Sequence, residues 1–427
     1  MKTNGRSICI IILLLFVEQV ACMGIGIDSI KRYFLYYSDS IELSEGVYFE
    51  YVLFEKEAFR FHPVNGFDLK QTALFHFRKD SCKRTQIGIR LQYAFSKRAF
   101  EPAVWIEKRV SRSSFRLDVN RELVDWKREM NESSKWFRNT WYCLAVHKNE
   151  KTLVDKWMGA LTYSFDSKQF ANMNMSSPHI QWSISAEYYK LRPVRNEVDF
   201  DMLFIWGDRS FKDNVPENYY VEDVHLRRLD DAVVGQASFS LSPNSSPNSP
   251  KFSVGTKYVF NDATLHLKLS AEQDVQWNDF GRIYWRVRCG HFFGRSGELT
   301  FHEWQHFLGS KRLFCPEVSG VGFGFNGFVD YGQYVMSTND LYADLDFRMM
   351  LPRMVLRLIP ALNNLHEAGE ELYIRRLLLH QQGKTYTQVG YGYNNILKIF
   401  RVGLLGSFCG SRFDGLSFRM NMRLNAL

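Results

Sequence analysis

The sequence predicts an all-β protein: a transmembrane antiparallel β-barrel of the outer-membrane type, with roughly 12 to 16 strands and some helical segments in loops or in a plug. Three observations predict this fold class. The chain ends in a strand with one apolar and one polar face, and segments of alternating polarity recur along most of its length. After the first residues, no apolar run reaches the length of a membrane-spanning helix.

The last residues of the chain show the clearest strand pattern. From Leu416 to Ala426 every even position is apolar and every odd position is polar, including Arg419 and Arg423. Because successive side chains of a strand point to opposite faces, the pattern places both arginines on one face. In an outer-membrane barrel the apolar face contacts lipid and the polar face lines the lumen.

The beginning of the chain resembles a signal for export. In residues 1–22, Lys2 and Arg6 lie before or at the edge of a short apolar stretch, and the small residues Ala21 and Cys22 suit a cleavage site. A lipoprotein signal with an acylated Cys22 is the alternative, and Gln19 argues against it because an aliphatic residue is usual there. We therefore expect an exported protein of the cell envelope.

The remaining chain divides into a short lead-in and a barrel. Residues 23–45 are too few for a folded domain and are expected to be a periplasmic lead-in, whereas residues 46–427 are assigned to the barrel. The sequence 242–250 is rich in Ser and Pro and predicts a loop between strands. Alternating or strand-like segments occur at 46–61, 87–95, 99–110, 180–189, 265–271, 281–290 and 341–349.

Charged residues share one face of several of these strands. Three charges on one face of the strand at 341–349 would be costly in the core of a soluble sandwich, but a watery lumen accommodates them. These side chains could select solutes, or they could form ion pairs that close a small barrel. The candidates for lining the lumen are Arg282, Arg286, Arg288, Asp344, Asp346, Arg348, Arg419 and Arg423.

Two segments do not show a strand pattern as clearly. Residues 111–139 are charged and weakly periodic, and we interpret them as an external loop with a helical turn at about 121–130. Residues 351–380 are rich in Leu and Arg, and predict an amphipathic helix in a loop or plug.

Charge and cysteine content narrow the classes of partner. The net charge of +8 is modest for 427 residues and is assigned to the lumen and to loops that face lipopolysaccharide, not to nucleic-acid binding. Outer-membrane lipid, the barrel-assembly machinery during insertion and a protein of the envelope are the expected partners. The seven cysteines contain no C-x-x-C pair, which argues against a zinc ribbon.

One motif favours an enzyme. Residues 302–306 contain H-E-x-x-H, in which a helix would place His302 and His306 on one face to bind zinc while Glu303 activates water. The surrounding sequence shows no helical stripe, and Arg312 stands where the extended motif needs a third histidine. We therefore expect no catalytic site and no cofactor. An exported zinc metallohydrolase and a soluble secreted all-β binding protein remain as alternatives.

Several stretches also resemble one protein family. They are Phe-Arg-Phe-His-Pro-Val-Asn-Gly-Phe-Asp-Leu at 59–69, Tyr-Ala-Phe-Ser-Lys-Arg-Ala-Phe at 93–100, Phe-Gly-Arg to Gly-His-Phe-Phe-Gly at 280–294, Ser-Thr-Asn-Asp-Leu-Tyr at 337–342, and the segment 389–402 with its Gly-Tyr-Gly-Tyr-Asn-Asn-Ile. In this order they resemble uncharacterised outer-membrane barrel proteins of Bacteroidota, which often carry an N-terminal carboxypeptidase-regulatory-like domain.

This resemblance implies an outer-membrane barrel without an established activity. Passage, docking or assembly at the envelope are the roles that we expect for such a protein. Two features depart from the family pattern. Residues 23–45 are too short for the regulatory-like domain, and the final residue is Leu427 where barrel-assembly signals prefer an aromatic residue.

Overall fold

The structure of the protein is a computed structural model that describes most of the chain, with gaps. The described residues are 37–54, 59–80, 83–126, 151–168, 177–198, 228–244, 248–276, 281–307, 334–351, 369–396 and 400–423, with short pieces within 139–149, 211–226, 246 and 309–331. The predicted export signal, Cys22 and residues 352–368 lie outside this part. Among the described residues, no helix has the length and apolar character needed to cross a membrane.

Long strands make up nearly all of the described chain. The first half contains β1 (Tyr37–Ser44), β2 (Val47–Phe54), β3 (Phe59–His62), β4 (Gly66–Asp80), β5 (Lys83–Ala94), β6 (Ala99–Val110), β7 (Ser113–Asp125), β8 (Leu153–Asp166) and β9 (His179–Pro193). The second half contains β10 (Ala232–Ser242), β11 (Lys251–Val259), β12 (Thr264–Gln276), β13 (Arg282–Gly294), β19 (Tyr342–Leu351), β20 (Gly369–Leu379), β21 (Lys384–Ile396), β22 (Phe400–Cys409) and β23 (Arg412–Arg423).

Short elements lie between β13 and β19. They are two 3-10 helices, η2 (Ser296–Glu298) and η3 (Phe301–Glu303), and the strands β14 (Gln305–His306), β15 (Gly309–Ser310), β16 (Phe314–Glu317), β17 (Phe328–Val329) and β18 (Ser337–Thr338). β14 pairs with β18, and β15 pairs with β17.

The long strands form one antiparallel meander. From β4 to β13 each strand pairs with the next in the chain, β13 pairs with β19, and the meander continues to β23. β2 and β3 pair with different parts of β4, so together they occupy one position in the sheet. The described sheet has 19 strands, against the expected 12 to 16, and β3 and β16 are the shortest of them with four residues each.

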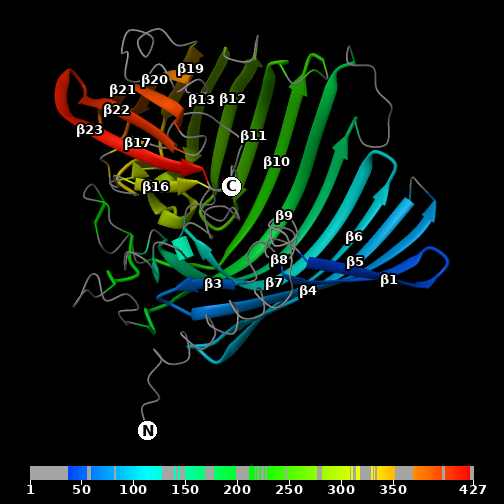
Figure 1. Cartoon of the computed structure of the whole chain (residues 1–427). Coiled ribbons are helices and arrows are strands. Elements are labelled where there is room, and N and C mark those ends of the chain that lie inside the picture. Colours follow the sequence, from blue (N-terminus) through cyan, green and yellow to red (C-terminus); the bar gives the residue numbers. More distant parts are fainter. Residues whose placement is uncertain are drawn as a thin grey trace, which may run out of the picture.

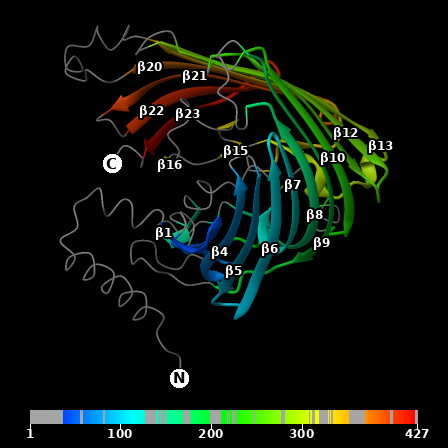
Figure 2. The ribbon, with the colours of Figure 1, turned by 90° about the vertical axis from the view of Figure 1, so that its right-hand side faces the viewer.

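The sheet is strongly curved (Figure 1), and the short strand β15 lies on its concave side (Figure 2). β1 lies at one end of the sheet, and at the other end β16 pairs in parallel with β23. Within the described residues β1 and β23 are not paired, so the curved sheet is not closed into a barrel by that pair. The all-β, antiparallel architecture predicted from the alternating pattern is confirmed.

The two faces of the sheet differ in the expected way. On β13, Tyr284, Arg286 and Arg288 point inward, whereas Val287 and Phe293 are exposed on the outer face. The pattern repeats around the sheet because side chains alternate along every strand. Exposed apolar residues of the outer face include Leu91, Val104, Val119, Leu161, Ile184, Phe239, Val254, Leu269, Val287, Ile374, Val389, Leu404 and Phe418.

Two segments differ from the sequence prediction. Within 111–139, residues 113–125 form strand β7 instead of an external loop with a helical turn. Within 351–380, residues 369–379 form strand β20 instead of an amphipathic helix. On β20, buried Tyr373, Arg375 and Leu377 alternate with exposed Ile374 and Leu378, as the period of two of a strand requires. Leucines on both faces conceal this alternation in the sequence.

The sheet also begins earlier than expected, since β1 starts at Tyr37 inside the segment assigned to a lead-in. It pairs with β2 from Tyr37 to Ser44, with register shifts at both ends. The loop predicted at 242–250 is confirmed, because β10 ends at Ser242 and β11 begins at Lys251.

Candidate functional site

Residues 296–307 and 334–340, which we call the inner segment, pack against the inner face of the sheet. Phe301, Phe307 and Met336 of this segment are buried in one hydrophobic cluster with Tyr189 of β9 and Val234 of β10. Antiparallel pairing of β14 with β18 joins the two parts of the segment. Because burial of its apolar side chains is favourable, this connection folds back onto the inner face of the sheet.

Glu303 fixes this segment to two strands of the sheet. Its carboxylate forms an ion pair with the Nζ atom of Lys257 on β11, and it accepts a hydrogen bond from the hydroxyl of Tyr189 on β9. Glu303 is only 2% exposed. A buried carboxylate needs such partners, because leaving it without a countercharge would be strongly unfavourable.

Further hydrogen bonds hold the second part of the inner segment. The hydroxyl of Tyr334 donates to Asp125 at the end of β7, with an O···O distance of 3.1 Å, and Nδ1 of His306 lies 2.8 Å from the hydroxyl of Ser337. Burial, followed by the nearby Asp125 carboxylate, raises the pKa of Tyr334 well above its ordinary value. Tyr334 therefore stays protonated and can keep donating this hydrogen bond.

The H-E-x-x-H residues do not lie on an α-helix. His302 and Glu303 belong to the 3-10 helix η3, Trp304 has extended backbone angles, and His306 is in strand β14. The i and i+4 geometry that would present two imidazoles to one zinc ion is therefore not formed. No group of three or more His, Cys, Asp or Glu residues in the described part of the chain is arranged to hold a metal ion.

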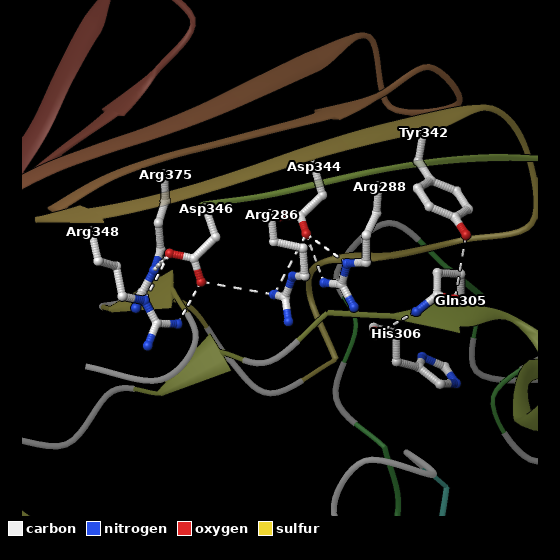
Figure 3. Close-up of polar contacts among 9 residues, drawn as sticks. All are labelled: Arg286, Arg288, Gln305, His306, Tyr342, Asp344, Asp346, Arg348 and Arg375. Carbon is white, nitrogen blue, oxygen red and sulfur yellow. Dashed lines mark hydrogen bonds and ion pairs between the residues drawn. The ribbon is translucent and has the colours of Figure 1, made fainter. Parts of the chain in front are cut away.

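A second polar region lies on β13, β19 and β20. We call it the charge cluster. Figure 3 shows its side chains on the same side of the strands as Tyr342, whose hydroxyl faces Gln305. It consists of Arg286, Arg288, Asp344, Asp346, Arg348 and Arg375.

Strand register brings the charges of this cluster together. Arg288 lies opposite Asp344, and Arg286 lies opposite Asp346. The closest approach between Arg288 and Asp344 is 2.7 Å, and Nε of Arg348 donates to Asp346 at 2.9 Å. Arg375 of β20 approaches the same carboxylate at 3.3 Å. Four arginines thus surround two aspartates, and the cluster retains positive charge.

Ion pairs cover other parts of the inner face as well. Arg90 of β5 contacts Glu122 of β7 at 2.8 Å, and Lys156 of β8 pairs with Glu187 of β9. Farther along, Arg401 of β22 lies 3.3 Å from Glu371 of β20, with both side chains fully buried. The inner wall is thus lined with charged side chains that contact each other, either between neighbouring strands or across one intervening strand.

The remaining candidates for lining the lumen lie apart from the charge cluster. Arg282 is the first residue of β13, and its Nε atom donates to Asp274 of β12 at 2.6 Å. Arg419 is buried on β23. Arg423 is the last residue of β23, and its side chain lies outside the described part. The structure thus brings Arg286, Arg288 and the three candidates of β19 together, whereas Arg282 and Arg419 are not part of this cluster.

Sequence reasoning missed several participants. The helix predicted for residues 351–380 does not place Arg375 on the inner face of a sheet, although Ile374 and Arg375 alternate in polarity as they do in a strand. Tyr189 and Lys257 lie in strands, but nothing local in the sequence indicates that they meet Glu303. Their contact depends on how the inner segment folds back, which is a long-range property.

A cavity of about 320 Å³ lies between part of the inner segment and the sheet. Its lining includes Ser183 and Ser185 of β9, Ser238 of β10, and Lys257 of β11, and residues 302–306 lie on the opposite side. The arrangement can bind a small polar molecule through hydroxyl and ammonium groups.

Comparison with known proteins gives a family and a distant structural likeness. The crystal structure of BamA from Haemophilus ducreyi lacking POTRA domains 1–3 is similar at a TM-score of 0.40 and 8% identity, over 90% of this chain and 74% of that one. No curated protein matches the sequence. Residues 37–393 match the C-terminal domain of a family of unknown function (DUF5686). Because this match spans most of the chain, the protein belongs to that family.

Proposed function

We propose that the protein is an integral outer-membrane β-barrel protein. The observation that carries this proposal is the band of exposed apolar residues on the outer face of the sheet, which extends over successive strands from β5 to β13 and from β20 to β23. A soluble monomer rarely exposes a contiguous apolar surface of this extent. Lipid is the environment in which such a face is stable, while charged groups point to the other side.

The proposed role is passage, docking or assembly at the cell envelope, with no catalytic step assigned to the chain. The inner segment is held against the wall by Glu303 and Tyr334, which supports a lumen that the protein itself obstructs. Passage would therefore require the inner segment to move. Outer-membrane lipid and lipopolysaccharide are the proposed surroundings, and the barrel-assembly machinery is the proposed partner during insertion.

Membrane fractionation followed by gel electrophoresis with and without boiling tests this proposal. We expect the full-length chain in the outer-membrane fraction, with a band whose mobility changes on heating because a closed barrel resists detergent unfolding. A soluble protein with the same mobility before and after boiling would overturn the proposal. In that case the apolar faces of the sheet would have to pack against protein.

A further inference from the structure

The two end strands of the curved sheet, β1 and β23, are not joined to each other in the described chain. β22 pairs with one edge of β23, and β16 pairs with the other edge at residues 420–423. Among the described residues, β1 pairs with β2. Open strand edges are strongly unfavourable in lipid, because their backbone groups find no hydrogen-bond partner there. A sheet of this kind in a membrane therefore has to join its two ends.

Strand direction decides how the ends can meet. All neighbouring long strands are antiparallel, so the direction reverses at each step from β1 to β23. The strands that run the same way as β1 are β4, β6, β8, β10, β12, β19, β21 and β23. β1 would therefore meet β23 in parallel. The pairing of β16 with β23 is also parallel, so this edge accepts a strand in that direction.

The edge of β23 has room for both strands. β23 is 12 residues long, β16 takes four of them, and β1 has eight residues, which match residues 412–419. Two collinear strands already share one edge elsewhere in this sheet. On β4, β2 lies beside residues 72–77 and β3 beside residues 66–69.

Both end strands carry apolar side chains on the outer face. Cross-strand pairing leads from Ile41 through Phe49 and Phe75 to the exposed apolar residues of β5 and β6. Leu43, two positions after Ile41, shares that face. Leu43 is 58% exposed, and Leu416 of β23 is 68% exposed. Apposition of the two strands would cover part of both side chains.

The alternation of polarity selects the register between the two strands. A shift by one residue would turn the apolar side chains of β1 towards the inner face. Ile41 lies beside Leu416 in the register that fits. Leu43 then lies beside Phe418, and both pairs stay on the outer face. In this register β1 ends directly before the residues of β23 that pair with β16.

We propose that β1 and β16 together form the closing seam of the barrel. β1 pairs in parallel with residues 412–419 of β23, and β16 continues the same line along residues 420–423. This inference rests on the proposed function, because it is lipid that makes open ends of the sheet unfavourable. β16 belongs to the connection between β13 and β19 that also contains the inner segment. Movement of that connection would withdraw β16, so the seam is where the barrel opens first.

Disulfide cross-linking of the full-length protein in isolated outer membranes tests the seam. Glu42→Cys/Ser417→Cys joins positions that lie side by side on the inner face in the proposed register. After mild oxidation we expect the linked peptides in mass spectrometry, and a band shift at a higher temperature than in the reduced form, because the ends of the sheet are then covalently joined. Ile41→Cys/Ser417→Cys is the matched control, since its two positions lie on opposite faces and should not link.

A second pair of variants decides the strand direction. Ser40→Cys/Gly415→Cys should link in a parallel seam, whereas Ser44→Cys/Gly415→Cys should link only in an antiparallel one. An added Cβ atom at Gly415 meets no other atom within 4 Å, so this position tolerates the change. Each variant is first checked, in its reduced form, for the heat-dependent band shift of the wild type.

The outcomes separate this inference from the proposed function. A wild type that shifts on heating, with no link in Glu42→Cys/Ser417→Cys or Ser40→Cys/Gly415→Cys, would overturn the seam and leave the membrane barrel in place. A link in Ser44→Cys/Gly415→Cys alone would overturn the parallel direction. A wild type that is absent from the outer-membrane fraction would overturn both proposals.

Discussion

Glu303 of the inner segment and Lys257 of β11 form an ion pair on the inner face of the sheet, although they belong to distant parts of the chain. Both side chains are largely buried, and Tyr189 adds a hydrogen bond to the same carboxylate. This contact joins the segment that contains H-E-x-x-H to the wall. It gives Glu303 a structural role.

Removing one partner of this pair should destabilise the fold. We expect Lys257→Met to lower the free energy of unfolding by about 3–5 kcal/mol, because it leaves the Glu303 carboxylate buried without its countercharge. The double variant Lys257→Met/Glu303→Gln should recover most of this loss. Denaturant unfolding in detergent, followed by tryptophan fluorescence, measures the difference. Equal stability of the wild type and Lys257→Met would show that the ion pair does not hold the segment.

Loosening the inner segment should increase conductance through the protein. In planar bilayers we expect Glu303→Ala/Tyr334→Phe to give larger or more frequent current steps than the wild type, because the polar contacts of both residues with the wall are removed. Arg295→Ala/Glu298→Ala is the matched control, since these residues lie in the same connection but are exposed. Identical traces from all three proteins would remove passage from the proposed roles and leave docking or assembly.

The charge cluster should be sensitive to the loss of Asp346. Asp346→Asn removes the carboxylate that Arg348 and Arg375 share, and both guanidinium groups are buried. We expect a loss of about 3–5 kcal/mol in unfolding free energy. Asp274→Asn, which affects the more exposed contact with Arg282, should lose at most about 1 kcal/mol. Similar midpoints of denaturant unfolding for the two variants would contradict this ranking.

A charge on the outer face should interfere with membrane insertion. Val287→Arg places a guanidinium in the middle of the apolar band, and we expect a loss of about 2–4 kcal/mol in folding free energy into lipid vesicles. Ser411→Arg, in the exposed turn between β22 and β23, should fold as the wild type does. If Val287→Arg also folds normally into vesicles, the outer face of the sheet at β13 does not contact the hydrocarbon core of the membrane.

Acid should weaken the contact between Asp340 of the inner segment and His380 after β20. Burial by itself would raise the pKa of Asp340, but the hydrogen bonds from His380 and from the backbone of Leu341, together with the charges of His380 and His291, outweigh it, so the pKa lies below its ordinary value. The stability that the Asp340–His380 contact contributes is therefore complete above about pH 4. It is lost as the pH falls through the lowered pKa of Asp340. Asp340→Asn should show a smaller decrease of stability in acid than the wild type, measured by unfolding midpoints between pH 3 and 6. Parallel pH profiles would contradict this assignment.

The alternation of polarity was enough to predict the sheet and its two faces. On β19 the sequence already placed Asp344, Asp346 and Arg348 together, and the structure buries all three on the inner face. The same reasoning failed for β20, where leucines on both faces obscured the period of two. A local pattern reveals a strand only when polar residues occupy one of its faces.

The sequence by itself determined that this protein is built from two-faced strands, because the side-chain period of a strand is local and can be read from neighbouring residues. Only the tertiary structure decided which charges meet. The approach of Arg375 to Asp346 depends on the register between β19 and β20, and the contact of Glu303 with Lys257 depends on the return of the inner segment to the sheet. Both are long-range contacts, set by packing between segments whose separate sequences do not specify each other.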